Sequence, residues 1–409
     1  MTGEILFLAH RIPFPPNRGD KIRSHHILRR LARMAPVHVA CFADDDGDQA
    51  EEVELAALSH SYRLVRRSKS LAWAGLQAIK GGDPISRTAF YDADLAAYVT
   101  QVLAQAAIGT IYVFSSQMGQ YVPDDFTGRV IMDFVDVDSA KFEAYAAERR
   151  GPMGWVFARE ARLLRAEEAR LAARADVSLL VSHKEADLFS QRLPAGVEAR
   201  VQALGNGIDS DFFDPALVAA EPNIAAARAP RLIFTGQMDY PPNIAAVERA
   251  ARRILPLVRQ SLPEASFHIV GRSPTDAVKA LAALPGVHVW GRVEDVRVWL
   301  KGADMALCPL EIARGVQNKV LEAMAMELPV VLSSAAATGI HALPGLHFAV
   351  ADEDAAIAAR IVDLAGNRLA ARTMGLEARR LVVGQQSWQS VLAPLAEIMT
   401  AACGRRDAA

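Results

Sequence analysis

The segment 308–326 combines residue types that bind anions. A short apolar strand ends in a loop that carries Arg314 and Gly315, and a helix is expected to begin near Val316. The first backbone N–H groups of a helix have no partner inside the helix, so they attract anions. Arg314 can hold a phosphate through two hydrogen bonds, and Lys319 adds a point charge. The segment therefore predicts an anion site at the start of a helix.

Glu322 is the unusual residue of this helix, because the residues around it are apolar. Gly315 and Lys319 are four residues apart, as are Asn318 and Glu322, so these residues share adjoining parts of one helical face. A buried carboxylate needs partners. A diol such as the ribose of a nucleotide can donate to both of its oxygens. The alternative is an i,i+3 salt bridge between Lys319 and Glu322, and the segment alone does not distinguish the two.

Around this segment, short apolar runs alternate with longer amphipathic stretches, which is typical of a parallel sheet covered by helices. In the first half the expected strands are 5–9, 37–42, 62–65, 110–114, 130–132 and 177–181, and the expected helices are 24–34, 93–107, 160–175 and 184–192. In the second half the expected strands are 232–235, 266–270, 287–290, 305–307 and 330–332, and the expected helices are 244–257, 296–301, 316–326 and 387–402. An α/β protein with two Rossmann-like domains and a linker near 200–210 follows, with ligands expected at the carboxyl ends of the strands.

Composition narrows the function classes. The 409 residues suit two domains, and 45 basic against 47 acidic residues argue against a nucleic-acid partner. No pair among Cys41, Cys308 and Cys403 has metal-site spacing, so neither zinc nor a disulfide framework is expected. The apolar run 5–9 is too short for a signal peptide, and no window suits a transmembrane helix. We expect a cytoplasmic protein.

The run Lys319-Val320-Leu321-Glu322-Ala323-Met324-Ala325, followed by Pro329-Val330-Val331, resembles the donor-binding signature of retaining GT-B glycosyltransferases of glycosyltransferase family 4. The resemblance implies a GT-B fold, with two Rossmann-like domains facing a cleft. Residues 1–203 would form the acceptor-side domain, to which 386–409 cross back, and 204–385 would bind a nucleotide sugar. Glu322 would hold the donor ribose. The diphosphate would lie at the helix start, at Gly315, Val316, Gln317 and Asn318.

The sequence also departs from the family pattern. Arg314 stands where the family often has a second glutamate that contacts the transferred sugar. After the strand 232–235, Gly236 is kept but Gln237 replaces an arginine that binds the diphosphate in the family. We therefore expect Arg314 and Lys319 to neutralise the diphosphate. Arg292 lies in a turn that resembles the family's G-x-V-x-D-V turn near the base.

The first expected strand is followed by a second basic loop. Gly19 at the start of a helix would let a ligand approach the backbone, and Arg18, Lys21 and Arg23 add positive charge. By resemblance, this loop would close on the diphosphate of the donor. The alternative is a turn followed by a solvated basic helix start.

Three acids follow the strand 130–132, and two of them form an Asp136-Val137-Asp138 triplet. Such triplets bind metal in GT-A transferases but are common elsewhere. With a GT-B signature in the chain, Asp136 would face the acceptor and orient its hydroxyl. Alternatively, Asp136 or Asp138 caps the following helix. The acidic run 44–48 lacks carboxylates at two required calcium-loop positions, so a solvated loop is expected there.

No acid lies between Leu55 and Gly82, although this stretch holds several Lys and Arg residues. Trp73, Leu76 and Ile79 lie among them. A basic segment with an apolar face suits an anionic membrane surface. The alternative is a surface helix that covers the core.

Together these features predict a retaining, metal-independent hexosyltransferase without a cofactor, with Arg314, Lys319 and Asp136 in catalysis. Its donor would be a UDP- or GDP-linked sugar, and its acceptor a glycan or polyprenyl-linked glycan. The sequence of residues 313–319 is similar to that of sugar transferases linked to the exopolysaccharide clusters that accompany the PEP-CTERM sorting system. Peripheral contact with the cytoplasmic face of the inner membrane is expected. The alternatives are a GT-B nucleotide-sugar epimerase and an inactive nucleotide-sugar-binding relic.

Overall fold

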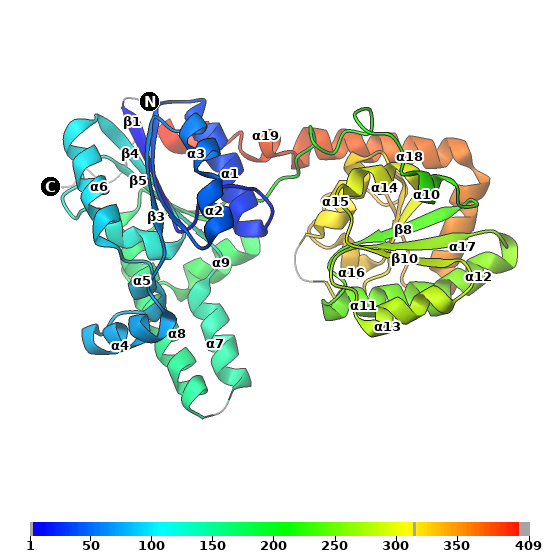
Figure 1. Ribbon diagram of the computed structural model, residues 1–409, viewed down its shortest axis with the longest axis horizontal. Coiled ribbons are helices and arrows are strands. Elements are labelled where there is room, and N and C mark those ends of the chain that lie inside the picture. The colour runs from blue at the N-terminus through cyan, green and yellow to red at the C-terminus, as the bar shows by residue number, and fades with distance from the viewer. Residues whose placement is uncertain (1–2, 150, 314–315, 401–409) are drawn as a thin grey trace. The chain divides into compact units, whose positions relative to one another are not determined.

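The computed structural model describes residues 3–149, 151–313 and 316–400. The chain divides into two compact units (Figure 1). Unit 1 comprises residues 1–206 and 391–409, and unit 2 comprises residues 207–390. Each unit has its own parallel sheet and its own cluster of buried apolar side chains. The expected α/β class with two Rossmann-like domains is therefore confirmed.

Unit 1 is built on a parallel sheet with the order β3-β2-β1-β4-β5-β6-β7. Its strands are β1 Glu4–Ala9, β2 Val37–Ala43, β3 Ser61–Arg66, β4 Ile108–Phe114, β5 Arg129–Val135, β6 Val177–Leu180 and β7 Val201–Ala203. Its helices are α1 Gly19–Ala32, α2 Asp46–Ala50, α3 Glu52–Leu58, α4 Leu71–Gly81, α5 Ile85–Ala89, α6 Ala93–Gln105, α7 Asp138–Glu148, α8 Pro152–Arg174, α9 His183–Arg192 and α20 Leu395–Thr400. The central strands are apolar along their length because helices cover both faces.

Unit 2 is built on a parallel sheet with the order β10-β9-β8-β11-β12-β13. Its strands are β8 Arg231–Thr235, β9 Ser266–Val270, β10 Val287–Gly291, β11 Met305–Cys308, β12 Val330–Leu332 and β13 Ala349–Val350. Its helices are α10 Pro222–Ala225, α11 Pro241–Arg249, α12 Leu255–Ser261, α13 Asp276–Ala280, α14 Val296–Gly302, α15 Asn318–Ala325, α16 Ser334–Ala337, α17 Asp354–Gly366 and α18 Arg368–Leu381, and α19 Trp388–Val391 ends where unit 1 resumes.

The strand orders locate where ligands bind in sheets of this type. In unit 1 the order reverses between β1 and β4, and in unit 2 it reverses between β8 and β11. Ligands of doubly wound sheets lie outside the carboxyl ends of the strands at such a reversal. Ligands are therefore expected at the loops that follow β1, β4, β8 and β11.

Several expected elements need correction. α1 begins at Gly19 rather than near residue 24, and α15 begins at Asn318 rather than near Val316. The expected final helix 387–402 is broken: α19 ends at Val391 and α20 begins at Leu395. Pro394 lies in this break, where it cannot donate a helical hydrogen bond. No helix among the described residues is long and apolar enough to cross a membrane.

Candidate functional site

A glycine turn at the carboxyl end of β8 starts the site in unit 2. Gly236 has a φ of 154°, which favours glycine. A side chain there would place its Cβ 3.0 Å from Nδ2 of Asn243 and 3.2 Å from Nζ of Lys319. The missing side chain therefore lets the β8 turn, α11 and α15 approach one another.

Lys319 holds its charge inside this cluster without a carboxylate partner. Its Nζ donates a hydrogen bond of 2.5 Å to Oδ1 of Asn243 and lies 4.3 Å from the centre of the Phe234 ring. Asn243 in turn donates to the carbonyl of Gln237 at 2.8 Å. Burial lowers the pKa of Lys319. The ammonium is thus fixed in place by neutral groups, and its charge remains available to an anion.

Glu322 lies one turn further along α15 and is the most perturbed acid of the site. Burial raises its pKa to about 7, although the nearby Lys319 lowers it. No hydrogen bond or salt bridge of the Glu322 side chain is found among the described residues, so the alternative of a salt bridge with Lys319 is not observed. A ligand that donates hydrogen bonds, such as a diol, would stabilise the ionised form of this carboxyl group.

The loop between β11 and α15 is anchored at its start. Arg249 donates to the carbonyl of Pro309 at 3.2 Å and to Asp354 at 2.7 Å. Ser333 donates to the carbonyl of Leu310 at 2.5 Å. These bonds fix the point from which the loop runs to the amino end of α15.

The remaining predicted residues of this loop lie around the helix start. Arg314 and Gly315 fall outside the described residues. Val316 is exposed, Gln317 precedes the helix and accepts from the amide of Val320 at 2.9 Å, and Asn318 is the first helical residue. The structure therefore brings Gln317, Asn318, Lys319 and Glu322 together with Gly236 and Gln237.

Two arginines extend the same edge of the sheet. Gly271 directly follows β9 and Gly291 ends β10, and the amide of Gly271 donates to the carbonyl of Gly291 at 2.8 Å. The residues that follow them, Arg272 and Arg292, are exposed. Arg272 donates to the side-chain oxygen of Gln237 at 2.9 Å. Sequence reasoning selected Arg292 and missed Arg272, because strand order rather than sequence spacing places Arg272 beside Gln237.

Unit 1 has a polar pocket at the carboxyl ends of β1, β4 and β5. Its volume is about 420 Å³. Its lining residues are His10, Arg11, Arg18, Asp20, Phe114, Ser115, Gln117, Phe134, Val135, Asp136, Asp138 and Lys141. Ser115 and Val135, directly after β4 and at the end of β5, have φ values of 78° and 68°. Such strained backbone in non-glycine residues is concentrated at functional sites.

Two acids of this pocket, Asp136 and Asp138, pair with a lysine and do not bond to the backbone of α7. Lys141 donates to Asp136 at 2.9 Å and to Asp138 at 3.2 Å. The amides of Val137 and Ser139 are instead bonded by Glu185 and Glu168 from other helices. The interpretation of Asp136 or Asp138 as a helix cap is therefore wrong. Both carboxylates line the pocket.

His10 is a pocket residue that sequence reasoning missed. Its ring stacks on Phe114, with 5.7 Å between the ring centres, and its Nε2 lies 3.5 Å from Asp20 and 3.3 Å from Arg11. Its Nδ1 is buried and has no hydrogen-bond partner among the described residues. The only signal in the sequence is its position directly after the first buried strand.

The predicted residues at the start of α1 have different surroundings. Gly19 is exposed and the space beside it is open. Arg18 is half exposed and donates to Asp20 at 3.1 Å. Lys21 is buried and pairs with Asp48, so the acidic run 44–48 is solvated only at residues 45–47 and not at its end. Of the residues predicted at the start of α1, only Gly19 and Arg18 are therefore accessible to a ligand.

Arg23 is fully buried within unit 1, which does not fit the expected contact with a donor. It forms two hydrogen bonds of 3.1 Å with Asp133 and donates to the carbonyls of Leu204 and Gly205 and to the side chain of Asn206. These bonds occupy its guanidinium group. The structure therefore gives Arg23 the role of joining α1 to β5 and to segment 204–206.

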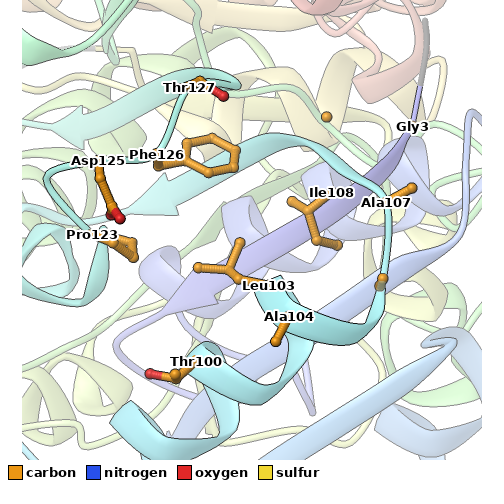
Figure 2. Close-up of a pocket in the computed structure, with 12 residues that line it drawn as sticks. Gly3, Thr100, Leu103, Ala104, Ala107, Ile108, Pro123, Asp125, Phe126 and Thr127 are labelled. Carbon is orange, nitrogen blue, oxygen red and sulfur yellow. The ribbon is translucent and has the colours of Figure 1, made fainter.

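A larger pocket of about 860 Å³ lies at the opposite edge of the unit 1 sheet (Figure 2). Leu103, Ile108 and Phe126 line it, and Asp125 is its only titratable side chain. It sits at the amino ends of β1 and β4, away from the edge where ligands of such sheets bind. We assign no function to it. No cluster of metal-binding side chains is found in the described part of the chain.

Comparison with known proteins agrees with this architecture. Residues 229–367 match the family model described as glycosyl transferases group 1. This match contains the β8 turn, Lys319 and Glu322. No curated protein sequence matches the chain.

Solved structures of similar fold span nearly the whole chain. HepE from Anabaena in complex with UDP has a TM-score of 0.63 at 15% identity, over 98% of this chain and 100% of that one. Sucrose-phosphate synthase from Thermosynechococcus elongatus has a TM-score of 0.58 at 14% identity, over 97% and 98%. WaaG, a glycosyltransferase involved in lipopolysaccharide biosynthesis, has a TM-score of 0.57 at 16% identity, over 97% and 100%. The chain has the GT-B fold, and the family match in unit 2 supports a glycosyltransferase function.

Proposed function

We propose that the protein transfers a sugar from a nucleoside diphosphate sugar, held by unit 2, to a glycan or lipid-linked glycan. The observation that carries this proposal is the carboxyl group of Glu322, which is partly buried near Lys319 without a side-chain hydrogen-bond partner among the described residues. A nucleotide offers what both groups lack: ribose hydroxyls for the carboxylate and phosphates for the ammonium. UDP is the first nucleotide to test, because HepE binds it.

The proposed chemistry concerns charge on the leaving group. Breaking the bond between the anomeric carbon and the diphosphate leaves negative charge on the diphosphate oxygens. Lys319, Arg314 and the first amides of α15 would stabilise this charge, and pre-positioned groups of this kind are among the strongest catalytic devices. The resemblance of the run 319–325 to the retaining family supports retention at the anomeric carbon. Fixed cations would supply the charge that a metal supplies in other transferases.

Unit 1 would supply the acceptor site. The pocket beside Asp136 and Asp138 is polar, and carboxylates can accept hydrogen bonds from sugar hydroxyls. In this proposal Asp136 orients the acceptor hydroxyl that attacks the anomeric carbon. The resemblance of residues 313–319 to sugar transferases of exopolysaccharide clusters supports a glycan acceptor of exopolysaccharide synthesis.

Thermal unfolding with UDP, GDP and ADP tests the donor site. A ligand at about 100 times its Kd should raise the free energy of unfolding by roughly 2.7 kcal/mol. We expect one nucleotide to stabilise the wild type and Glu322→Gln to lose this response. Glu264→Gln is the matched control, because Glu264 lies just before the amino end of β9 and pairs with Arg228. An equal response in Glu322→Gln would remove Glu322 from the site.

Product analysis by NMR separates the proposed activity from its alternatives. With a nucleotide sugar and a glycan acceptor, we expect a new glycosidic bond with the anomeric configuration of the donor. Conversion of the donor without an acceptor would instead indicate epimerisation. Nucleotide binding without turnover of any donor would indicate an inactive relic.

A further inference from the structure

Helix α4 turns three large apolar side chains away from the core of unit 1. Ala74 and Ala78 are fully buried against unit 1. Trp73, Leu76 and Ile79 are 57%, 63% and 56% exposed. They follow one another at three-residue spacing, so they form a stripe along the solvent side. A surface helix normally turns such a stripe toward the core. The reversal indicates that this face is covered by something outside the fold of unit 1.

The start of α8 carries a further exposed apolar side chain near α4. Arg159 donates to the carbonyl of Ala78 at 2.8 Å, which places the first turns of α8 beside α4 (Figure 1). Trp155 lies four residues before Arg159 and so on the same side of α8. Its side chain is 62% exposed. We call Trp73, Leu76, Ile79 and Trp155 the apolar patch.

The rim of the apolar patch is positive. Lys80 is exposed, and Lys69 donates to the carbonyls of Thr88 and Tyr91 at 3.1 Å. Arg159 also donates to backbone carbonyls. No salt bridge of Lys69, Lys80 or Arg159 with a carboxylate is found among the described residues. The nearest acid in the sequence, Asp83, pairs with Arg87.

We propose that the apolar patch docks unit 1 on an anionic lipid bilayer. Tryptophan favours the level of the headgroups, and lysine stems can lie along apolar surface while their charges reach lipid phosphates. A second copy of the chain fits the patch less well, because pairing two copies would bring two positive rims together. An anionic bilayer neutralises the rim instead.

Vesicle flotation of the full-length protein tests this docking without any assay of sugar transfer. We expect binding to vesicles of phosphatidylcholine mixed with phosphatidylglycerol, and little binding to phosphatidylcholine alone. The double variant Trp73→Ser, Leu76→Ser should lower the partition coefficient about tenfold or more, since each large side chain contributes that much when buried. Lys80→Gln should lower it about fivefold.

A matched control is Leu369→Ser, because Leu369 is 77% exposed on α18 of unit 2. It should leave flotation unchanged. Each variant must keep the circular dichroism spectrum and melting temperature of the wild type, which the exposure of these side chains allows. Equal flotation of the double variant and the wild type would overturn the proposal. So would equal binding to both vesicle types, or a lipid-free dimer that the double variant abolishes.

Discussion

At the residue scale, Glu322 links stability to pH. Its pKa is about 7 in the folded protein and roughly 4.3 in an unfolded chain. Between these values the folded state binds a proton that the unfolded state has released. The free energy of unfolding therefore falls as pH rises through this window. Above pH 7 the carboxyl group is ionised in both states, and the full cost of burying the charge is present.

Glu322→Gln should remove this cost while it removes the nucleotide response. We expect its melting temperature relative to the wild type to increase from pH 4.5 to 7 and then to stay level. Each kcal/mol corresponds to about 2–4 °C for a domain of this size. The measurement is melting of both proteins in parallel across pH, since other groups such as Glu168 titrate equally in both. A difference independent of pH would contradict the assignment.

Arg272 should contribute to donor binding through its charge. It is exposed beside Gln237, which stands where the resembling family has an arginine. Arg272→Ala should weaken nucleoside diphosphate binding about tenfold, as expected for a lost charge-assisted hydrogen bond. Titration calorimetry measures the Kd, with Arg252→Ala as the control at an exposed arginine in the π-helical segment Ala250–Ile254 between α11 and α12. Equal Kd values for both variants would leave Arg272 outside the site.

At the element scale, the buried pair of Arg23 and Asp133 joins α1, β5 and segment 204–206. Removing one partner leaves the other charge buried without its counter-ion, so Asp133→Asn should lower the free energy of unfolding by about 3–5 kcal/mol. Arg18→Ala removes an exposed pair with Asp20 and should cost less than about 1 kcal/mol. Urea unfolding of both variants measures the difference. A small decrease in the free energy of unfolding in both variants would mean that the buried pair contributes little to holding these elements together.

Most strands could be predicted because each central strand is an apolar run buried on both faces. β7 and β13 could not, because Val201–Ala203 and Ala349–Val350 are too short to show a pattern. The burial around Glu322 could be predicted from its apolar neighbours. His10, Arg272 and the partners of Arg23 could not, because strand order brings them together from distant parts of the sequence.

At the scale of the whole molecule, the chain has two separate cores. The buried apolar residues of unit 1 and of unit 2 form different clusters. We expect two transitions in calorimetric unfolding. A bound nucleoside diphosphate should raise only the transition of unit 2, and Glu322→Gln should abolish this shift. A single transition that moves as a whole would show instead that the two units unfold together.

The hydrogen bond between β5 and α20 has a consequence for synthesis on the ribosome. Arg129 at the start of β5 donates to the carbonyl of Ile398 at 2.9 Å. Unit 1 therefore includes a segment that follows the whole of unit 2 in the sequence. Residues 207–390 leave the exit tunnel before residue 398 does. Unit 2 can thus complete its sheet while unit 1 still lacks α20. The part of the protein made first should be the last to acquire its native protection, which pulse-labelling of nascent chains would detect.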